Sequence, residues 1–268
     1  MSILLSVYFR EGIVFAADKN ATLTFADGTR DVEVGKFTKV LAWPYRRAAV
    51  GWCGLGSLGG LPTDDWLRVF IAQHRDFDDL DQLAANLVRA IQVDFDREYA
   101  TDPPPADAGL IIHLGGFKAV GEQVVPAMYH IYNVDMEGGT YGPAARLFVQ
   151  SEDVKAQFDE WGPEDYPARV QERLGEMLDE RDHILWFNNG AMFPIFNILK
   201  GHLWSALSDL RRLTSQPASL DDLQAYCRMA VSLYGSWFEE HSLPHQRAVG
   251  GGVDAVSIPW PRPPEGSK

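Results

Sequence analysis

Apolar residues run almost without interruption through two short parts of the chain near its start. Residues 2–18 consist of two apolar runs around a turn at 10–12, and residues 39–54 consist of two more around a turn at 44–47. Apolar runs of this length, bounded by turn-forming residues, are typical of buried strands. The pattern therefore predicts two antiparallel β-hairpins.

The turns also predict which residues face each other across each hairpin. Residues equidistant from the turn are neighbours, so the start of the chain is expected beside Asp18, and Lys39 is expected close to Gly54. If both hairpins belong to one sheet, the chain terminus, a carboxylate, a lysine and a glycine amide converge at one place. Each residue taken alone also has a purely structural interpretation; an Asp at a strand end, for example, is often a turn former.

Helical spacing follows the hairpins and returns late in the chain. A helix is predicted after Pro62, with Trp66 and Phe70 on its apolar face, and a second after the capping residue Asp79. Their large aromatic side chains suggest contacts between subunits. Further elements are strands at 109–114 and 128–135 and helices at 168–180, 192–213 and 219–241. The last helix begins with the capping pattern Ser219-x-x-Asp222.

Ser2 provides the first candidate for chemistry. It follows the initiator Met and has a small side chain, so ordinary methionine removal is expected to leave Ser2 with a free α-amine and a free hydroxyl. A terminal hydroxyl residue can act as a nucleophile whose own amine accepts its proton. The reference pKa of an α-amine is about 7.7–8.0, so part of the population is neutral at cellular pH.

Three further residues complete this candidate site. The charge of Lys39 would lower the pKa of the α-amine, and Asp18 would hold the ammonium in place. The N–H of Gly54 would donate to the oxyanion of a tetrahedral intermediate. Trp52 lies two residues before Gly54 on the same strand, which predicts that its indole forms one wall of a shallow substrate pocket.

Three segments resemble those of a known family: 12–22, 37–40 and 50–55. They are similar to the proteasome β-subunit family, including its bacterial relatives, within the N-terminal nucleophile hydrolases. In that family the terminal nucleophile lies sixteen residues before the aspartate, and Ser2 and Asp18 have that spacing. Segment 250–258 is similar to the family's closing glycine-rich turn and last strand.

The resemblance implies an α+β fold, a four-layer αββα sandwich of two antiparallel sheets flanked by helices. It implies one domain over residues 2–258, with an insertion at about 145–183 and a tail at 259–268. The implied activity is hydrolysis of peptide or amide bonds inside a ring or other homo-oligomer. Peptide or unfolded protein would lie extended against Asn20, Ala21 and Thr22.

The chain also departs from the family at three positions. Ala191, Gln246 and Val249 stand where active members have Ser, Asp and Ser, which orient the terminal amine. These departures favour an alternative, a structural subunit that keeps the fold and has lost catalysis. A second alternative is an N-terminal nucleophile hydrolase acting on small amides. The substrate, the ring size and any ATPase partner are not specified by the sequence.

Composition narrows the classes of partner. The 268 residues carry a formal charge of −13 with scattered Lys and Arg, which argues against nucleic acid. Two cysteines suggest a reducing compartment, and without a recognisable signal peptide or membrane span we expect a cytoplasmic protein. No cofactor or metal is expected, because His241 and His245 form the one close histidine pair and lack a third ligand nearby.

Overall fold

The computed structural model describes eleven parts of the chain, and all structural statements below concern them. They are residues 2–9, 11–24, 30–33, 35–44, 47–104, 108–120, 123–134, 144–152, 185–190, 219–241 and 249–261. The predicted helices at 168–180 and 192–213 lie outside them.

The first hairpin forms the centre of a four-stranded antiparallel sheet. Strand β1 (Ile3–Phe9) pairs with β2 (Gly12–Asp18), and Leu4 faces Ala17. The outer strands come from the other end of the chain: β12 (Leu185–Gly190) pairs with β1, and β13 (Val253–Pro259) pairs with β2. The predicted hairpin is confirmed, and it is held on both sides by distant segments.

The second hairpin belongs to a five-stranded antiparallel sheet. The strand order is β11 (Ala144–Glu152), β10 (Gln123–Val134), β9 (Leu110–Val120), β6 (Ala48–Gly54) and β5 (Val40–Ala42). Strand β11 covers the start of the segment that the sequence suggests as an insertion.

The two hairpins belong to different sheets, so the condition under which they would converge within one sheet is not met. Both free edges of the first hairpin are taken by β12 and β13, and β6 uses its second edge to pair with β9. Strands β1 and β2 instead contact β6 face to face, from the opposing sheet. The two hairpins therefore meet across the interface between the sheets.

Three helices are present among the described residues. These are α1 (Thr63–Gln73), α2 (Leu80–Glu98) and α6 (Leu220–His241). The side chain of Asp79 accepts the N–H groups of Asp81 and Gln82, as the capping prediction requires. The capping pair of α6 is also confirmed, since Ser219 and Asp222 each accept the other's backbone N–H. None of the three is both long and apolar enough to cross a membrane.

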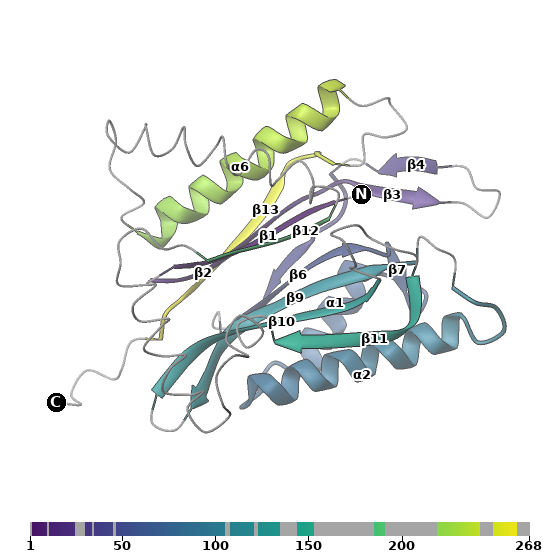
Figure 1. Ribbon diagram of the computed structural model, residues 1–268, viewed down its shortest axis with the longest axis horizontal. Helices are drawn as coiled ribbons and strands as arrows, with labels where there is room; N and C mark the ends of the chain where they lie inside the picture. The colour runs from purple at the N-terminus through teal and green to yellow at the C-terminus, as the bar shows by residue number, and fades with distance from the viewer. Residues whose placement is uncertain are drawn as a thin grey trace, which may run out of the picture.

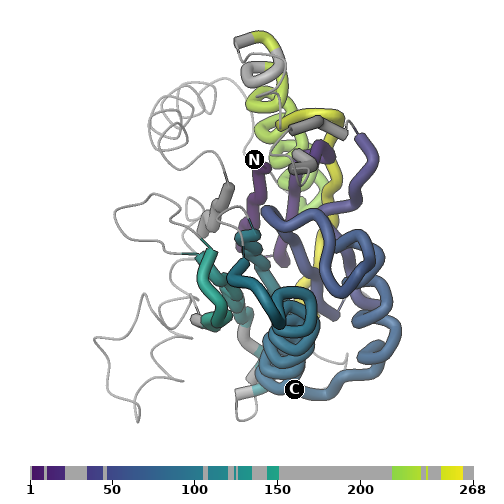
Figure 2. Tube along the Cα trace, turned by 90° about the vertical axis from the view of Figure 1, so that its right-hand side faces the viewer, coloured from purple at the N-terminus to yellow at the C-terminus, as the bar shows by residue number. Residues whose placement is uncertain are grey.

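The helices cover the outer faces of the two sheets (Figure 1). Helix α6 contacts β1, β2 and β13, whereas α2 contacts β9, β10 and β11, and α1 contacts β5. Two short ribbons complete the described structure: β3 (Ala21–Thr24) with β4 (Arg30–Glu33), and β7 (Ser57–Leu58) with β8 (Leu61–Pro62). Figure 2 shows α2 and α6 at opposite ends of the molecule.

The aromatic residues of α1 and α2 pack inside the molecule and do not form an exposed surface. Trp66, Phe70 and Phe95 are 7%, 3% and 0% exposed, and all belong to the core between these helices and the five-stranded sheet. The expectation that these side chains mark subunit contacts is therefore wrong. Amphipathic spacing shows that a helix has an apolar face, but it does not show what covers that face.

The interface between the sheets contains a small polar cluster. The side chains of Ser6 and His113 are hydrogen-bonded at 2.8 Å, and both residues are fully buried. The ring of His130 lies edge-on to His113, with 5.1 Å between the ring centroids. Burial, and for His113 also its neighbour His130, lowers the pKa of both imidazoles, that of His130 to about 4.

Candidate active site

Ser2, Asp18 and Lys39 meet at one end of the interface between the sheets. Ser2 precedes β1, Asp18 ends β2, and Lys39 directly precedes β5 in the opposing sheet. The ammonium nitrogen of Lys39 is 2.8 Å from Ser2 Oγ and 3.1 Å from Asp18 Oδ1. The three residues are buried, with exposed fractions of 6%, 0% and 0%.

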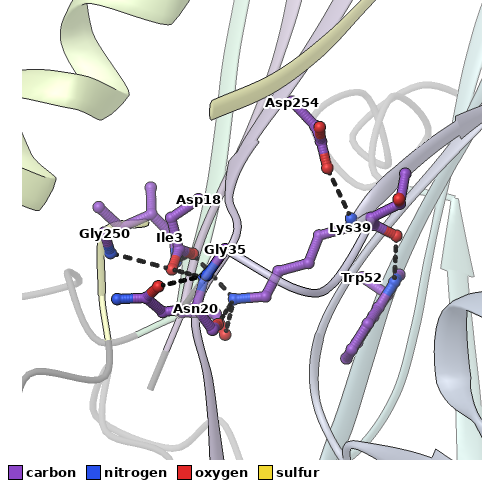
Figure 3. Close-up of polar contacts among 10 residues, drawn as sticks. Ile3, Asp18, Asn20, Gly35, Lys39, Trp52, Gly250 and Asp254 are labelled. Atoms are coloured by element: carbon purple, nitrogen blue, oxygen red, sulfur yellow. Dashed lines mark hydrogen bonds and ion pairs between the residues drawn. The ribbon is translucent and has the colours of Figure 1, made fainter. Parts of the chain in front are cut away.

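Lys39 uses all three of its donors. Besides Ser2 and Asp18, its ammonium donates to the backbone carbonyl of Asn20 (Figure 3). A lysine ammonium has three N–H donors and no acceptor, so three acceptors fit the protonated form. The contacts therefore favour a Lys39 that supplies positive charge over a Lys39 that accepts a proton.

Asp18 receives four hydrogen-bond donors, two at each oxygen. Oδ1 accepts the N–H of Ile3 at 2.7 Å and the ammonium of Lys39. Oδ2 accepts the N–H groups of Asn20 and Gly250, both at 3.2 Å. Burial raises the pKa of Asp18, while the charge of Lys39 and the N–H groups of Ile3 and Gly250 act in the opposite direction.

The glycine-rich turn near the end of the chain is part of this site. The carbonyl of Gly250 accepts the N–H groups of Lys19 and Asn20 at 3.0 and 3.2 Å. Gly251 has a φ of +70°, and a Cβ added there would lie 1.9 Å from Asn20 Oδ1. Only glycine allows the turn to approach this closely.

The segment that carries Lys39 is fixed through its backbone. The N–H of Thr38 donates to Asp64 Oδ2 at 3.0 Å, and the N–H of Lys39 donates to Asp254 Oδ2 at 3.2 Å. The carbonyl of Lys39 accepts the N–H of Trp52 at 3.0 Å. The sequence analysis did not identify either carboxylate as part of the site. For Asp254 a signal was available, because it is an aspartate inside the last, otherwise largely apolar strand.

Gly54 and Trp52 are placed differently from the first three residues. Lys39 faces Trp52 in the hairpin, and Gly54 lies two residues further, exposed at the end of β6. A Cβ at Gly54 would lie 2.0 Å from the Gly109 carbonyl oxygen. Packing alone therefore explains why this position is a glycine. The indole of Trp52 is 0% exposed and donates to the carbonyl of Thr38 at 3.2 Å. Trp52 is thus a core residue in this structure.

The three residues expected beside a substrate strand lie next to the site. Asn20 is buried, and its side-chain oxygen accepts the N–H of Gly35 at 3.1 Å. Ala21 and Thr22 belong to β3 and face Glu33 and Val32 of β4. Within the described residues β3 pairs only with β4, so its other edge carries no strand.

Of the three positions that depart from the family pattern, the structure describes one. Val249 is fully buried in the core between α6 and the four-stranded sheet. It therefore contributes packing where a hydroxyl was expected, and the next residue, Gly250, provides an N–H to Asp18. Ala191 and Gln246 lie outside the described residues.

Neither cysteine has the character of a reactive thiol. Cys53 and Cys227 are both buried and unpaired with each other. Burial raises the pKa of the Cys53 thiol to about 12 and that of Cys227 further. In the parts of the chain described here, no group of three His, Cys, Asp or Glu side chains is arranged to hold a metal ion.

Comparison with known proteins gives matches at the level of solved structures. No protein-family model matches the chain, and no curated protein matches it. One similar structure is Anbu (ancestral beta-subunit) from Yersinia bercovieri, with 13% identity, a TM-score of 0.46, and coverage of 96% of this chain and 81% of that chain. Another is the Gly-1 mutant of Anbu from Hyphomicrobium sp. strain MC1, with 15% identity, a TM-score of 0.42, and coverage of 97% and 82%.

These matches correct the resemblance drawn from the sequence. The similar structures carry the name Anbu, ancestral beta-subunit, so the assignment to proteasome β-subunits of the bacterial homologue type is wrong. The segments that suggested it, 12–22, 37–40 and 50–55, encode two hairpins and a glycine turn. Local backbone geometry demands those features, so they do not distinguish one group of relatives from another.

Proposed function

We propose that this chain hydrolyses peptide or other amide bonds with Ser2 as a terminal nucleophile. The observation that carries the proposal is the buried contact of Lys39 with both Ser2 Oγ and Asp18, at 2.8 and 3.1 Å. A buried cation beside a hydroxyl can activate that hydroxyl as a nucleophile. Burying the charge costs desolvation energy, and such costly arrangements are concentrated at functional sites.

The proposed reaction begins with removal of Met1, which turns the backbone nitrogen of Ser2 into a free amine. Ser2 Oγ then attacks the substrate carbonyl carbon while its proton passes to the α-amine. Lys39 remains an ammonium, so its charge lowers the pKa of the α-amine and favours the neutral base. The oxyanion formed on the substrate oxygen accepts an N–H, for which Gly54 is the candidate.

The second half of the reaction returns the proton. The tetrahedral intermediate collapses, the C–N bond breaks, and the leaving amine takes the proton held by the α-ammonium. Water then attacks the resulting ester on Ser2, with the α-amine again as base, and releases the acid and the free hydroxyl. Among the described residues one edge of β3 has no strand beside it, which supports an extended substrate lying along Asn20, Ala21 and Thr22.

The packing supports the further inference that the complete fold is a four-layer αββα sandwich over residues 2–258. Helix α6 contacts one sheet, α1 and α2 contact the other, and the two sheets contact each other. We also propose that the chain self-associates; light scattering that finds a single chain over a wide concentration range would exclude this.

A second candidate is a subunit of an assembly that has the fold without catalysis. Val249 favours it, because this buried valine lacks the hydroxyl that would help orient a terminal amine. A hydrolase of small amides is the third candidate, and it would require a site closed to an extended strand.

Covalent labelling separates the catalytic candidates from the non-catalytic one. Protein made in a cytosol is treated with a hydroxyl-reactive β-lactone or epoxyketone, and intact mass and peptide mapping locate the adduct. We expect loss of Met1 and one adduct on Ser2, absent in Ser2→Ala. Ser6→Ala is the matched control, since Ser6 lies on β1, the strand that Ser2 precedes, and its hydroxyl is bonded to His113 inside the sheet interface.

Labelling of Ser2→Ala at the wild-type rate would refute Ser2 as the nucleophile. A mature protein that retains Met1 and still hydrolyses peptides would refute the α-amine as the base. Quantitative Met1 removal without any adduct or turnover would support the non-catalytic candidate.

A further inference from the structure

Asp254 connects the two sheets next to Lys39. It lies in β13, at the edge of the four-stranded sheet, yet its Oδ2 accepts the backbone N–H of Lys39 from the opposing sheet at 3.2 Å. Figure 3 shows the Asp254 carboxylate above the Lys39 backbone nitrogen that it contacts. The backbone N–H of Trp52 donates to the Lys39 carbonyl at 3.0 Å. The peptide groups on both sides of Lys39 are thus fixed from two different layers.

The strand that carries Asp254 is itself held on both sides. One edge of β13 pairs with β2, where Asp254 faces Ala17. On the other edge, the Arg228 side chain of α6 donates to the carbonyls of Val253 and Ala255 at 3.1 and 3.3 Å. These are the residues immediately before and after Asp254, so its carboxylate projects from a backbone with little freedom to move.

The second oxygen of the Asp254 carboxylate has a different partner. Asp254 Oδ1 lies 3.6 Å from the ammonium of Lys19, and the two side chains are 19% and 31% exposed. An ion pair of this exposure contributes little to stability. Of the two contacts of Asp254, the hydrogen bond to the Lys39 N–H is therefore the one that affects the geometry of the candidate site.

We propose that Asp254 is a positioning residue that holds the Lys39 ammonium against Ser2 and Asp18. The inference rests on the proposed function of Ser2. Lys39 reaches these partners with a long, rotatable side chain. Because its backbone is held at both the N–H and the carbonyl, only the side-chain torsions remain free to move the ammonium away from Ser2 and Asp18. Asp254 touches neither the nucleophile nor substrate, so it acts through Lys39.

Two substitutions separate the hydrogen bond from the charge. Asp254→Asn removes the charge but keeps an acceptor oxygen for the Lys39 N–H. Asp254→Ala removes both. Lys19→Met is the matched control, because it removes the other partner of Asp254 and leaves the contact with Lys39.

Competitive trace labelling with acetic anhydride reads the position of Lys39 directly. The protein is labelled between pH 6 and 9, and peptide mass spectrometry gives the acetylation rates of Lys39 and of the Ser2 α-amine. We expect Lys39 to be protected in wild type, Asp254→Asn and Lys19→Met. In Asp254→Ala its rate should rise about tenfold, the factor expected when a hydrogen bond to a charged group is lost.

The pH midpoint for the Ser2 α-amine is the second readout. In Asp254→Ala it should rise toward the ordinary value, because Lys39 no longer stays near. Loss of a negative charge alone would lower that midpoint, and would do so equally in both variants. If Asp254→Ala does not fold, Asp254→Ser, whose shorter side chain does not reach Lys39, replaces it.

An acetylation rate of Lys39 that is the same in Asp254→Ala as in wild type would overturn the inference. A rate raised equally in Asp254→Asn and Asp254→Ala would overturn it too. Lys39 labelling decides this even if wild type hydrolyses no peptide and Ser2 takes no covalent probe. Absence of both hydrolysis and labelling would refute the proposed function, and it would leave the positioning role of Asp254 to be decided by the Lys39 acetylation rates.

Discussion

At the scale of single residues, the candidate site depends on one buried ion pair. Lys39 and Asp18 are both fully buried, and their 3.1 Å contact lies in the interior of the protein. Desolvation of two charges offsets much of the attraction between them, whereas removal of one partner leaves the other charge uncompensated. The stability of the chain and the chemistry of Ser2 are thus linked through the same two side chains.

Lys39→Met is therefore expected to lower the free energy of unfolding by about 3–5 kcal/mol, since it leaves the Asp18 carboxylate buried without its counterion. Urea titration followed by tryptophan fluorescence measures the change. The double variant Lys39→Met/Asp18→Asn is the control, and it should recover part of the loss while remaining unreactive toward the covalent probe. A single variant as stable as wild type would contradict this account of the pair.

Gly251→Ala tests the approach of the closing turn to Asn20. The φ of +70° and the 1.9 Å approach of an added Cβ to Asn20 Oδ1 act together at this position. Gly60→Ala is the matched control, because Gly60 has a φ of +80° and open space around it.

We expect about 1–2 kcal/mol of backbone strain in Gly60→Ala, with probe labelling of Ser2 unchanged. Gly251→Ala should lose more stability in thermal unfolding and most of the labelling, since Asn20 must move. Equal losses in the two variants would mean that the turn does not fix Asn20.

At the scale of elements, the sequence predicts what is local and misses what is distant. Apolar runs and turn residues specify the hairpins, and Asp79 and Ser219 mark helix starts correctly. Which sheet receives each hairpin depends on β9, β12 and β13, whose pairing no local pattern reveals. For the same reason Ser2, Asp18 and Lys39 could be nominated from spacing, whereas Asp64 and Asp254 reach the Lys39 segment only in the folded chain.

Within the described part of the chain, β11 has a neighbouring strand on one side only, and a helix side chain bonds the backbone on its other side. The Gln92 side chain of α2 donates to the Arg146 carbonyl and accepts the Phe148 N–H, both at 2.9 Å. Gln92→Leu should therefore raise the hydrogen-exchange rate of the Phe148 amide about tenfold. Gln82→Leu on the same helix is the control, since Gln82 donates to Asn86 within α2. Unchanged exchange in Gln92→Leu would show that β11 is held by β10 alone.

At the scale of the whole molecule, stability should depend on pH through the histidines between the sheets. The pKa of His130 is lowered from 6.5 to about 4 by burial, and that of His113 is lowered well below 6.5. As pH falls below 6.5, the unfolded chain binds protons before the folded one, so stability is full above 6.5 and declines down to about pH 4.

For His130 the loss amounts to about 3 kcal/mol over this window, and thermal unfolding between pH 7 and 4 measures it. His130→Phe should flatten the decline and leave the stability above pH 7 within about 1.5 kcal/mol of wild type. A decline of the same slope in His130→Phe would assign the effect to other groups.

The division of the site between two sheets has a consequence for the order of events during folding. Ser2 and Asp18 come together as soon as the first hairpin forms, because their contact through Ile3 is local. Lys39 arrives only when the opposing sheet docks. A chain still emerging from the ribosome, or one partly unfolded, thus carries an ordinary amine and an ordinary hydroxyl. Under the proposed function, hydrolysis would therefore begin only after the two sheets have docked.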